Sequence, residues 1–296
     1  MVSIPDQAGS RDRRGLLSER ARIRRVGFSA GLRWLPAGAE LLFAGLGPLA
    51  GLASLWLLIS LIAVVIPVIG QLFLVLLTPM LTAGVLVGYD QVRRGQAPPP
   101  FTLFAGWKEP SARSGLLVIG AWSIAGSMLA AGVFIGWLGS QISPEELEAA
   151  MESPETLVQA LEGVSLGGGL LMSGSIFALV LAAIYFAIPL VMFNRWPTMA
   201  SLLTSIKAVV VNWAAFLGFG LAFMAVAAGL GLILVLISVL TMALGQFGVI
   251  AGQVVILIAT MFMQMLMAGG QYVAFCQVFG FGGDDESPSD DSQLMA

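Results

Sequence analysis

The sequence predicts an all-α integral membrane protein with six transmembrane helices. Of its 296 residues, 58% are apolar and only 10% are charged, compared with about 25% charged residues in soluble domains. Six uncharged apolar runs are each long enough to cross a hydrocarbon core of about 30 Å as a helix. We expect these spans at about residues 48–69, 71–89, 114–138, 169–193, 213–243 and 248–279.

The sequence around the spans divides into a head, an insert and a tail. Residues 1–31 are polar, arginine-rich and without the apolar core of a secretory signal peptide, which predicts a retained, mostly disordered cytoplasmic head. The six-helix transmembrane domain covers residues 32–282. Within it, residues 141–162 form an acidic periplasmic insert, in which Ser143-Pro144-Glu145-Glu146 predicts the start of a short helix. Residues 283–296 are expected to be an acidic, disordered cytoplasmic tail.

The positive charges predict the orientation of these spans. All 14 Lys and Arg residues lie in three segments on one side: eight within residues 1–33, before the first span, four between the second and third spans, and two between the fourth and fifth. Because Lys and Arg stay on the cytoplasmic side during insertion, both termini are expected in the cytoplasm. Trp34, Trp107, Trp196 and Trp213 fall at the same predicted interface, where tryptophan is enriched.

A short amphipathic segment precedes each pair of spans. In the clearest segment, residues 199–210, the apolar side chains occupy one helical face, and Ser201, Thr204, Ser205 and Lys207 occupy the other. Looser versions cover residues 32–46 and 101–107. Helices of this kind are expected to lie in the headgroup plane on the cytoplasmic side.

The sequence also predicts three parallel repeats, each an interfacial helix followed by a transmembrane hairpin. The second helices of the first and third hairpins share a motif, because Met80–Gly84 matches Met265–Gly269. Residues 78–81 likewise resemble residues 188–191 of the second hairpin. Since each unit contains two spans, all three units have the same orientation, which predicts a pseudo-threefold bundle.

Several of these elements also point to a family. They are the lead-in helix, the hairpin turn Ile66-Pro67-Val68-Ile69-Gly70, the element from Pro79 to Gly84, and Leu103-Phe104-Ala105-Gly106-Trp107. On these motifs, about residues 32–280 resemble a family of uncharacterised six-span proteobacterial inner-membrane proteins. Members of that family often carry basic residues where this chain has Ala44-Gly45. Because the family has no assigned activity, the resemblance implies a fold and a bacterial inner membrane only.

The composition excludes several kinds of chemistry. The chain has no histidine and a single cysteine, Cys276, so it cannot form a Ser/His dyad, a His-ligated haem or zinc site, or a disulfide framework. No span contains a charged residue, which disfavours proton-coupled transport. Asp90, at the inner end of the second span, is expected to form an interfacial ion pair with Arg93 and Arg94. We therefore expect no catalytic residues, metal or cofactor.

Three groups of candidate functional residues remain. Gln253, Thr260, Gln264 and Gln271, together with Gln246, share one face of the sixth span and predict either a polar cavity for a neutral or zwitterionic solute or hydrogen bonds between helices. Pro79 and Pro189 predict kinks inside spans. Contacts with anionic lipid headgroups are expected from Arg33, Arg93, Arg94, Lys108, Arg195 and Lys207.

These observations favour a non-enzymatic scaffold, assembly or lipid-organising protein, with the bilayer as its main partner and with room for a protein partner or a homo-oligomer. The alternative is a transporter or channel for a neutral or lipid-like solute, which would use the polar stripe and the two kinks. A membrane enzyme is the weakest hypothesis, because Glu40, Asp90 and Glu109 form no recognisable acid/base pair by spacing. Nucleic-acid binding lacks the aromatic or folded context it requires.

Overall fold

The structure, a computed structural model, describes residues 23–142, 164–242 and 244–282. Within these ranges the chain is helical and contains no strand. Six helices are long and apolar enough to cross a membrane, which confirms the all-α, multi-pass prediction. They are α3 (Leu46–Val65), α4 (Ile69–Arg93), α6 (Pro110–Gly139), α9 (Leu166–Asn194), α11 (Trp213–Met242) and α12 (Gly245–Phe279). The predicted helix in the acidic insert and the predicted acidic tail lie outside the described residues.

The ends of the spanning helices differ from the expected ones by a few residues. The largest differences are four residues: α3 ends at Val65 instead of residue 69, α4 continues to Arg93 instead of ending at residue 89, and α6 begins at Pro110 instead of residue 114. Pro67 lies in the turn and has no N–H for a helical hydrogen bond, so the first helix stops before it. The turn is tight, because a Cβ on Gly70 would overlap the carbonyl group of Ala63.

The segments that precede the hairpins are less uniform than the sequence suggests. The first is a full helix, α2 (Phe28–Ala44), which begins four residues before the expected start of the membrane domain at residue 32. The second is not a single α-helix but a 3-10 turn, η1 (Pro100–Phe104), followed by one helical turn, α5 (Ala105–Lys108). The third is α10 (Thr198–Val211).

The buried face of α10 differs from the expected one. Ser201, Ser205 and Ala208 are buried on the side that packs against α9, whereas Met199 and Leu203 are 60% and 61% exposed. Small hydroxyl-bearing residues allow two helices to approach closely and to exchange hydrogen bonds. Ser201 and Ser205 of the predicted polar face are therefore buried, although Lys207 of that face is exposed and Leu202 of the apolar face is buried.

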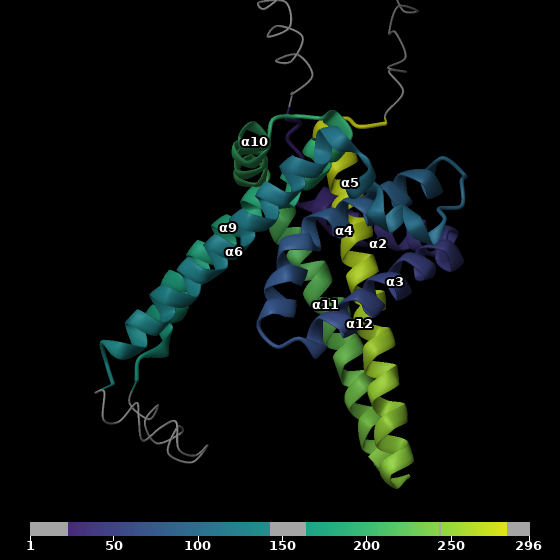
Figure 1. Cartoon of the computed structure of the whole chain (residues 1–296), viewed down its shortest axis with the longest axis vertical. Helices are drawn as coiled ribbons and strands as arrows, with labels where there is room; N and C mark the ends of the chain where they lie inside the picture. The colour runs from purple at the N-terminus through teal and green to yellow at the C-terminus, as the bar shows by residue number, and fades with distance from the viewer. Residues whose placement is uncertain (1–22, 143–163, 243, 283–296) are drawn as a thin grey trace, which may run out of the picture.

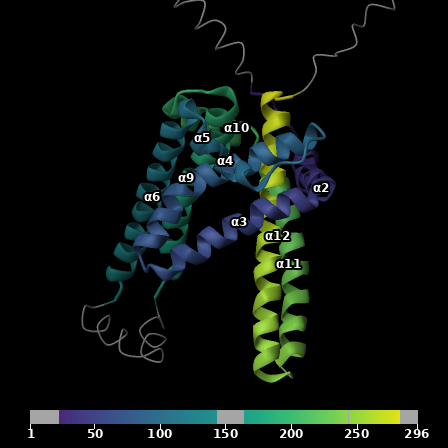
Figure 2. The same ribbon diagram turned by 45° about the vertical axis from the view of Figure 1, so that its right-hand side comes forward.

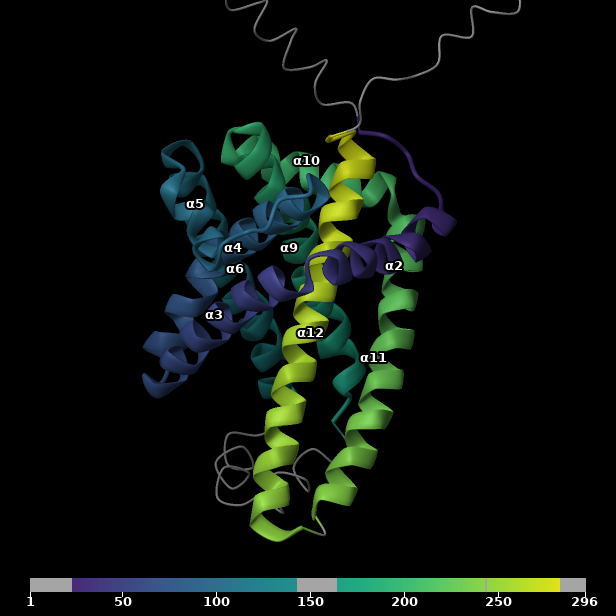
Figure 3. The ribbon, with the colours of Figure 1, turned by 90° about the vertical axis from the view of Figure 1, so that its right-hand side faces the viewer.

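Long helices that follow one another in the chain contact each other in the pairs α3–α4, α6–α9 and α11–α12, which are the pairs expected to form the three hairpins (Figure 1). The second helices, α4, α9 and α12, also contact one another. Each leading segment packs against another hairpin: α2 crosses α11 and α12, η1 and α5 lie on α4, and α10 lies on α9 (Figure 3). The first described residues lie against the end of α12, because the Arg24 amide donates to the Val278 carbonyl at 2.8 Å.

The core lies where α4, α9 and α12 meet. Tyr89, Phe186, Tyr272 and Phe275 are almost completely buried there. Farther along, the α6–α9 and α11–α12 hairpins diverge from each other (Figures 1 and 2). The far half of α11 is consequently exposed, with Leu232 at 74%.

Candidate functional site

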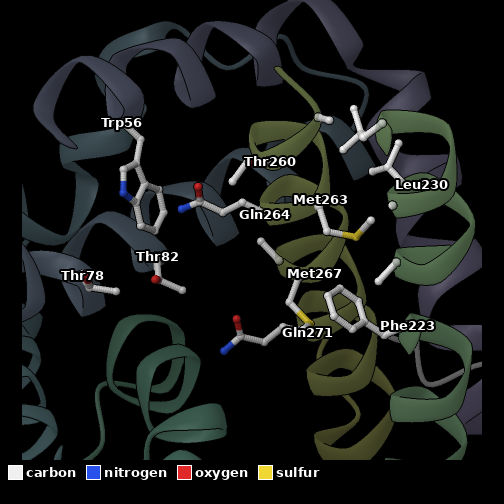
Figure 4. A pocket seen from close by; sticks show the side chains of 15 residues that line it. Trp56, Thr78, Thr82, Phe223, Leu230, Thr260, Met263, Gln264, Met267 and Gln271 are labelled. Carbon is white, nitrogen blue, oxygen red and sulfur yellow. The ribbon is translucent and has the colours of Figure 1, made fainter. Parts of the chain in front are cut away.

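A cavity of about 650 Å³ lies between α3, α4, α11 and α12. Trp56 of α3, Thr78 and Thr82 of α4, and Thr260 and Gln264 of α12 contribute the polar groups on its wall, together with Gln271 at one end (Figure 4). The rest of the wall is apolar: Phe223, Ala227, Leu230, Gly231, Leu234, Ala259, Met263, Met267 and Ala268. All of these residues belong to four of the six long apolar helices.

The predicted polar stripe of α12 is only partly in this cavity. Thr260, Gln264 and Gln271 line it, whereas Gln253 is exposed and closer to the turn between α11 and α12. Gln246 is likewise exposed, at the very start of α12. The stripe therefore divides into a part near the turn, which does not line this cavity, and a part farther along α12, which does.

Hydrogen bonding separates the polar groups of the cavity into two classes. Thr78 and Thr260 donate to the carbonyl groups one turn earlier in their own helices, at 2.8 and 2.9 Å. Among the hydrogen bonds of the described residues, none involves the side chains of Trp56, Thr82 or Gln264. Figure 4 shows the Gln264 amide pointing toward Trp56, with Thr82 facing the same space from α4. These three groups are free to bind a molecule in the cavity.

Gln271 is already engaged, and its partner is the backbone carbonyl that Pro189 leaves without a helical donor. Pro189 has no N–H, so the carbonyl of Tyr185, one turn earlier in α9, lacks its usual helical donor. The Gln271 Nε2 donates to this carbonyl at 2.6 Å. Gln271 is 8% exposed, which removes this bond from competition with water. The amide therefore satisfies the proline-freed carbonyl and joins α12 to α9 at one end of the cavity.

A second side chain enters α9 from the other side of the same turn. The Ser205 hydroxyl of α10 donates to the Ala182 carbonyl at 2.6 Å and accepts from the Phe186 amide at 2.9 Å. In a regular α-helix these two backbone groups pair with each other. Residues 182–189 of α9 are therefore held from outside, by α10 and by α12. This role was not predicted from the sequence, which placed Ser205 only on the polar face of an interfacial helix.

Pro79 is buried in α4, one residue after Thr78. Its position lies beside the cavity wall, but it does not itself line the cavity. Tyr89, ten residues farther along α4, donates from its hydroxyl to the Met265 carbonyl at 2.7 Å and so ties α4 to α12.

Asp90 lies at the end of α4, and its carboxylate has more ionic and hydrogen-bonding partners than the expected ion pair alone would provide. Its carboxylate is 3.3 Å from Arg93 Nη2 and 2.7 Å from Arg94 Nη2. The Tyr272 hydroxyl of α12 donates to the same carboxylate at 2.7 Å. Arg93 also donates to the Gly282 carbonyl at 2.7 Å. Asp90 is thus the centre of a contact that fastens the end of α4 to the end of α12.

The remaining candidate headgroup contacts lie on helix ends and leading segments. Arg33, Lys108 and Lys207 are exposed. Arg195 is also exposed and lies 3.5 Å from Glu109, an exposed pair of the kind that contributes little stability. All of them are accessible to a charged surface.

Trp56 and Thr82 were missed by the sequence analysis as lining residues. Thr82 has a detectable signal, because it follows Thr78 by one helical turn and so lies on the same face of α4. Trp56 has none, because its place in the cavity depends on how α3 crosses α4. Among the described residues, no group of three or more His, Cys, Asp or Glu side chains could hold a metal ion. No protein-family model, curated protein or solved structure matches the chain.

Proposed function

We propose that this protein is a non-enzymatic, lipid-organising protein of a bacterial inner membrane, which accommodates a lipid-like molecule in the cavity between α3, α4, α11 and α12. The observation that carries the proposal is the cavity itself, about 650 Å³ in volume and lined mostly by apolar side chains. Ligand sites typically have volumes of about 300–1,000 Å³ and apolar walls with a few polar groups. The cavity has both properties.

The position of the cavity supports a ligand taken from the bilayer. The cavity is lined by helices that are long and apolar enough to span the membrane. A lipid could therefore enter sideways without crossing a charged surface. The alternative function, transport of a lipid between the two leaflets, would begin with the same binding step.

The interhelical contacts support the further proposal of three repeats. Each leading segment packs on the hairpin that precedes it, if the third hairpin is taken to precede the first. Gly84 and Gly269, which are equivalent in the shared motif, both receive the backbone of a leading segment. A Cβ on Gly84 would overlap Leu103, and one on Gly269 would lie 2.8 Å from the Gly38 carbonyl oxygen. The middle unit departs from this pattern, because α10 is held on α9 by Ser205.

The charge distribution supports cytoplasmic termini, because every Lys and Arg belongs to the head, a leading segment or an adjoining helix end. The exposed Arg33, Lys108, Arg195 and Lys207 would then meet anionic lipids of the inner leaflet. A reporter fused after residue 290 should be active only as a cytoplasmic reporter.

Two matched variants of α11 test the binding proposal. Gly231 lines the cavity, Gly229 is exposed, and a Cβ on either residue would meet no atom within 4 Å. Gly231→Leu therefore fills the cavity, while Gly229→Leu adds the same side chain outside it. Native mass spectrometry of the full chain, released from nanodiscs that contain dioctanoylglycerol, should show one bound lipid in the wild type and in Gly229→Leu but not in Gly231→Leu. Equal occupancy in all three proteins, or in none, would contradict the proposal.

A protein scaffold is the second candidate. It is favoured by the far half of α11, where Leu232, Val235 and Leu236 are all at least 60% exposed. A defined oligomer or a stoichiometric protein partner, purified without bound lipid, would support this candidate over the first.

A further inference from the structure

We infer that the cavity selects a neutral lipid of the diacylglycerol class, whose polar group is uncharged and both donates and accepts hydrogen bonds. The inference rests on the proposed function and specifies its ligand. The recognition site consists of Trp56, Thr82 and Gln264, whose side chains face one another across the cavity (Figure 4).

The three side chains offer complementary hydrogen-bonding groups. The Trp56 indole can only donate, the Thr82 hydroxyl can donate and accept, and the Gln264 amide offers two N–H groups and one carbonyl oxygen. Trp56 as a whole is only 9% exposed, and its N–H has no hydrogen-bond partner among the described residues. Polar groups in apolar surroundings are costly unless they are paired. A ligand with a hydroxyl group and ester carbonyls would pair all three residues.

The described lining of the cavity carries no charged side chain, and this determines which class of lipid headgroup it can accept. No Asp, Glu, Lys or Arg is among the described residues that line the cavity. The nearest charged residue along α4 is Asp90, eight residues from Thr82 and hence about 12 Å farther along the helix. Its carboxylate and the nearby Arg93 and Arg94 are already paired with each other. A phosphate in the cavity would therefore be buried without a counter-charge, at a high free-energy cost.

The size of the cavity fits part of such a lipid. A volume of about 650 Å³ accommodates a glycerol backbone, its esters and the first segments of the acyl chains. The remainder of the acyl chains would then extend into the surrounding bilayer. Gln264 lies near the middle of α12, so the glycerol group is held deep within the spanning region and not at its surface.

Two lipids with identical acyl chains test the inference. Dioctanoylglycerol and dioctanoyl phosphatidic acid differ only in the phosphate, and each can be titrated against the full chain in phosphatidylcholine nanodiscs with native mass spectrometry as the readout. We expect dioctanoylglycerol to bind at least about tenfold more tightly, because phosphate must be desolvated without a partner. Gln264→Leu should weaken its binding by about fivefold to tenfold, the loss of one or two hydrogen bonds.

Gln253→Leu is the matched control, since it makes the same change on the same helix outside the cavity. It should leave the affinity for dioctanoylglycerol unchanged. The inference is overturned if phosphatidic acid binds as tightly, or if Gln264→Leu and Gln253→Leu have equal effects. In either case, the proposed function still holds if Gly231→Leu no longer binds the lipid that the wild-type protein binds. If neither lipid binds the wild-type protein, the proposed function fails as well.

Discussion

The contact between Gln271 and the Tyr185 carbonyl allows a quantitative test of why α9 is joined to α12. Gln271→Leu removes the donor and leaves the carbonyl unpaired in an apolar environment, because Pro189 cannot supply an N–H. An unsatisfied buried group costs about 1–3 kcal/mol, and measured hydrogen bonds between membrane helices are worth up to about 1.7 kcal/mol. We therefore expect a loss of about 1–2 kcal/mol in the free energy of unfolding.

The decisive comparison is made in a Pro189→Ala background. Alanine restores the N–H, which can donate to Tyr185 within the helix, so the same Gln271→Leu change should then cost no more than about 0.5 kcal/mol. The double-mutant cycle cancels whatever Pro189→Ala does on its own and should give a coupling of about 1 kcal/mol. The free energy of unfolding of all four proteins can be measured in bicelles, by titration with sodium dodecyl sulfate followed by circular dichroism.

The control for this cycle is Gln264→Leu, which lies on the same face of α12 and forms no hydrogen bond with α9 among the described residues. Its effect should be additive with that of Pro189→Ala. The reasoning is refuted if Gln271→Leu costs the same amount in both backgrounds, because the proline-freed carbonyl would then not be what the amide satisfies.

Three further changes test the rest of the packing. Gly84→Leu should lower the free energy of unfolding by at least about 3 kcal/mol, because its side chain would overlap the backbone of Leu103. Protein abundance and melting temperature should fall accordingly. Gly174→Leu, whose side chain would point into open space, should be tolerated. Ser205→Ala should cost about 1 kcal/mol or less in the same unfolding assay, because the Phe186 amide can pair within its own helix once the hydroxyl is gone. Asp90→Asn should lower stability by about 1–2 kcal/mol without abolishing lipid binding, and a loss of binding at normal abundance would contradict its structural role.

The sequence was sufficient for the spanning helices because a long uncharged run has few alternatives in a chain with 10% charged residues. It also identified the inner part of the polar stripe, since Gln264 and Gln271 follow directly from helical periodicity. It could not tell a lining residue from a bridging one, because that depends on which helix faces each side chain. Gln271 meets a carbonyl of α9, whereas Gln264, two turns away, meets an open cavity.

The sequence also could not show which face of α10 is buried. Apolar periodicity identified an amphipathic helix, but not which side would be covered. In water the apolar side would be buried, yet beside lipid the apolar side chains can remain outside and small polar residues can pack inward. Ser205 is buried for this reason, while Leu203 is 61% exposed.

The most direct measurement is photocrosslinking of the full chain, in membrane vesicles, with a diacylglycerol that carries a diazirine close to its glycerol group. Peptide mapping should then place the crosslinks at the cavity wall around Thr82 and Gln264, and Gly231→Leu should abolish them while Gly229→Leu retains them. Crosslinks spread along the exposed face of α11, and unchanged by Gly231→Leu, would show that lipid surrounds this protein without occupying its cavity.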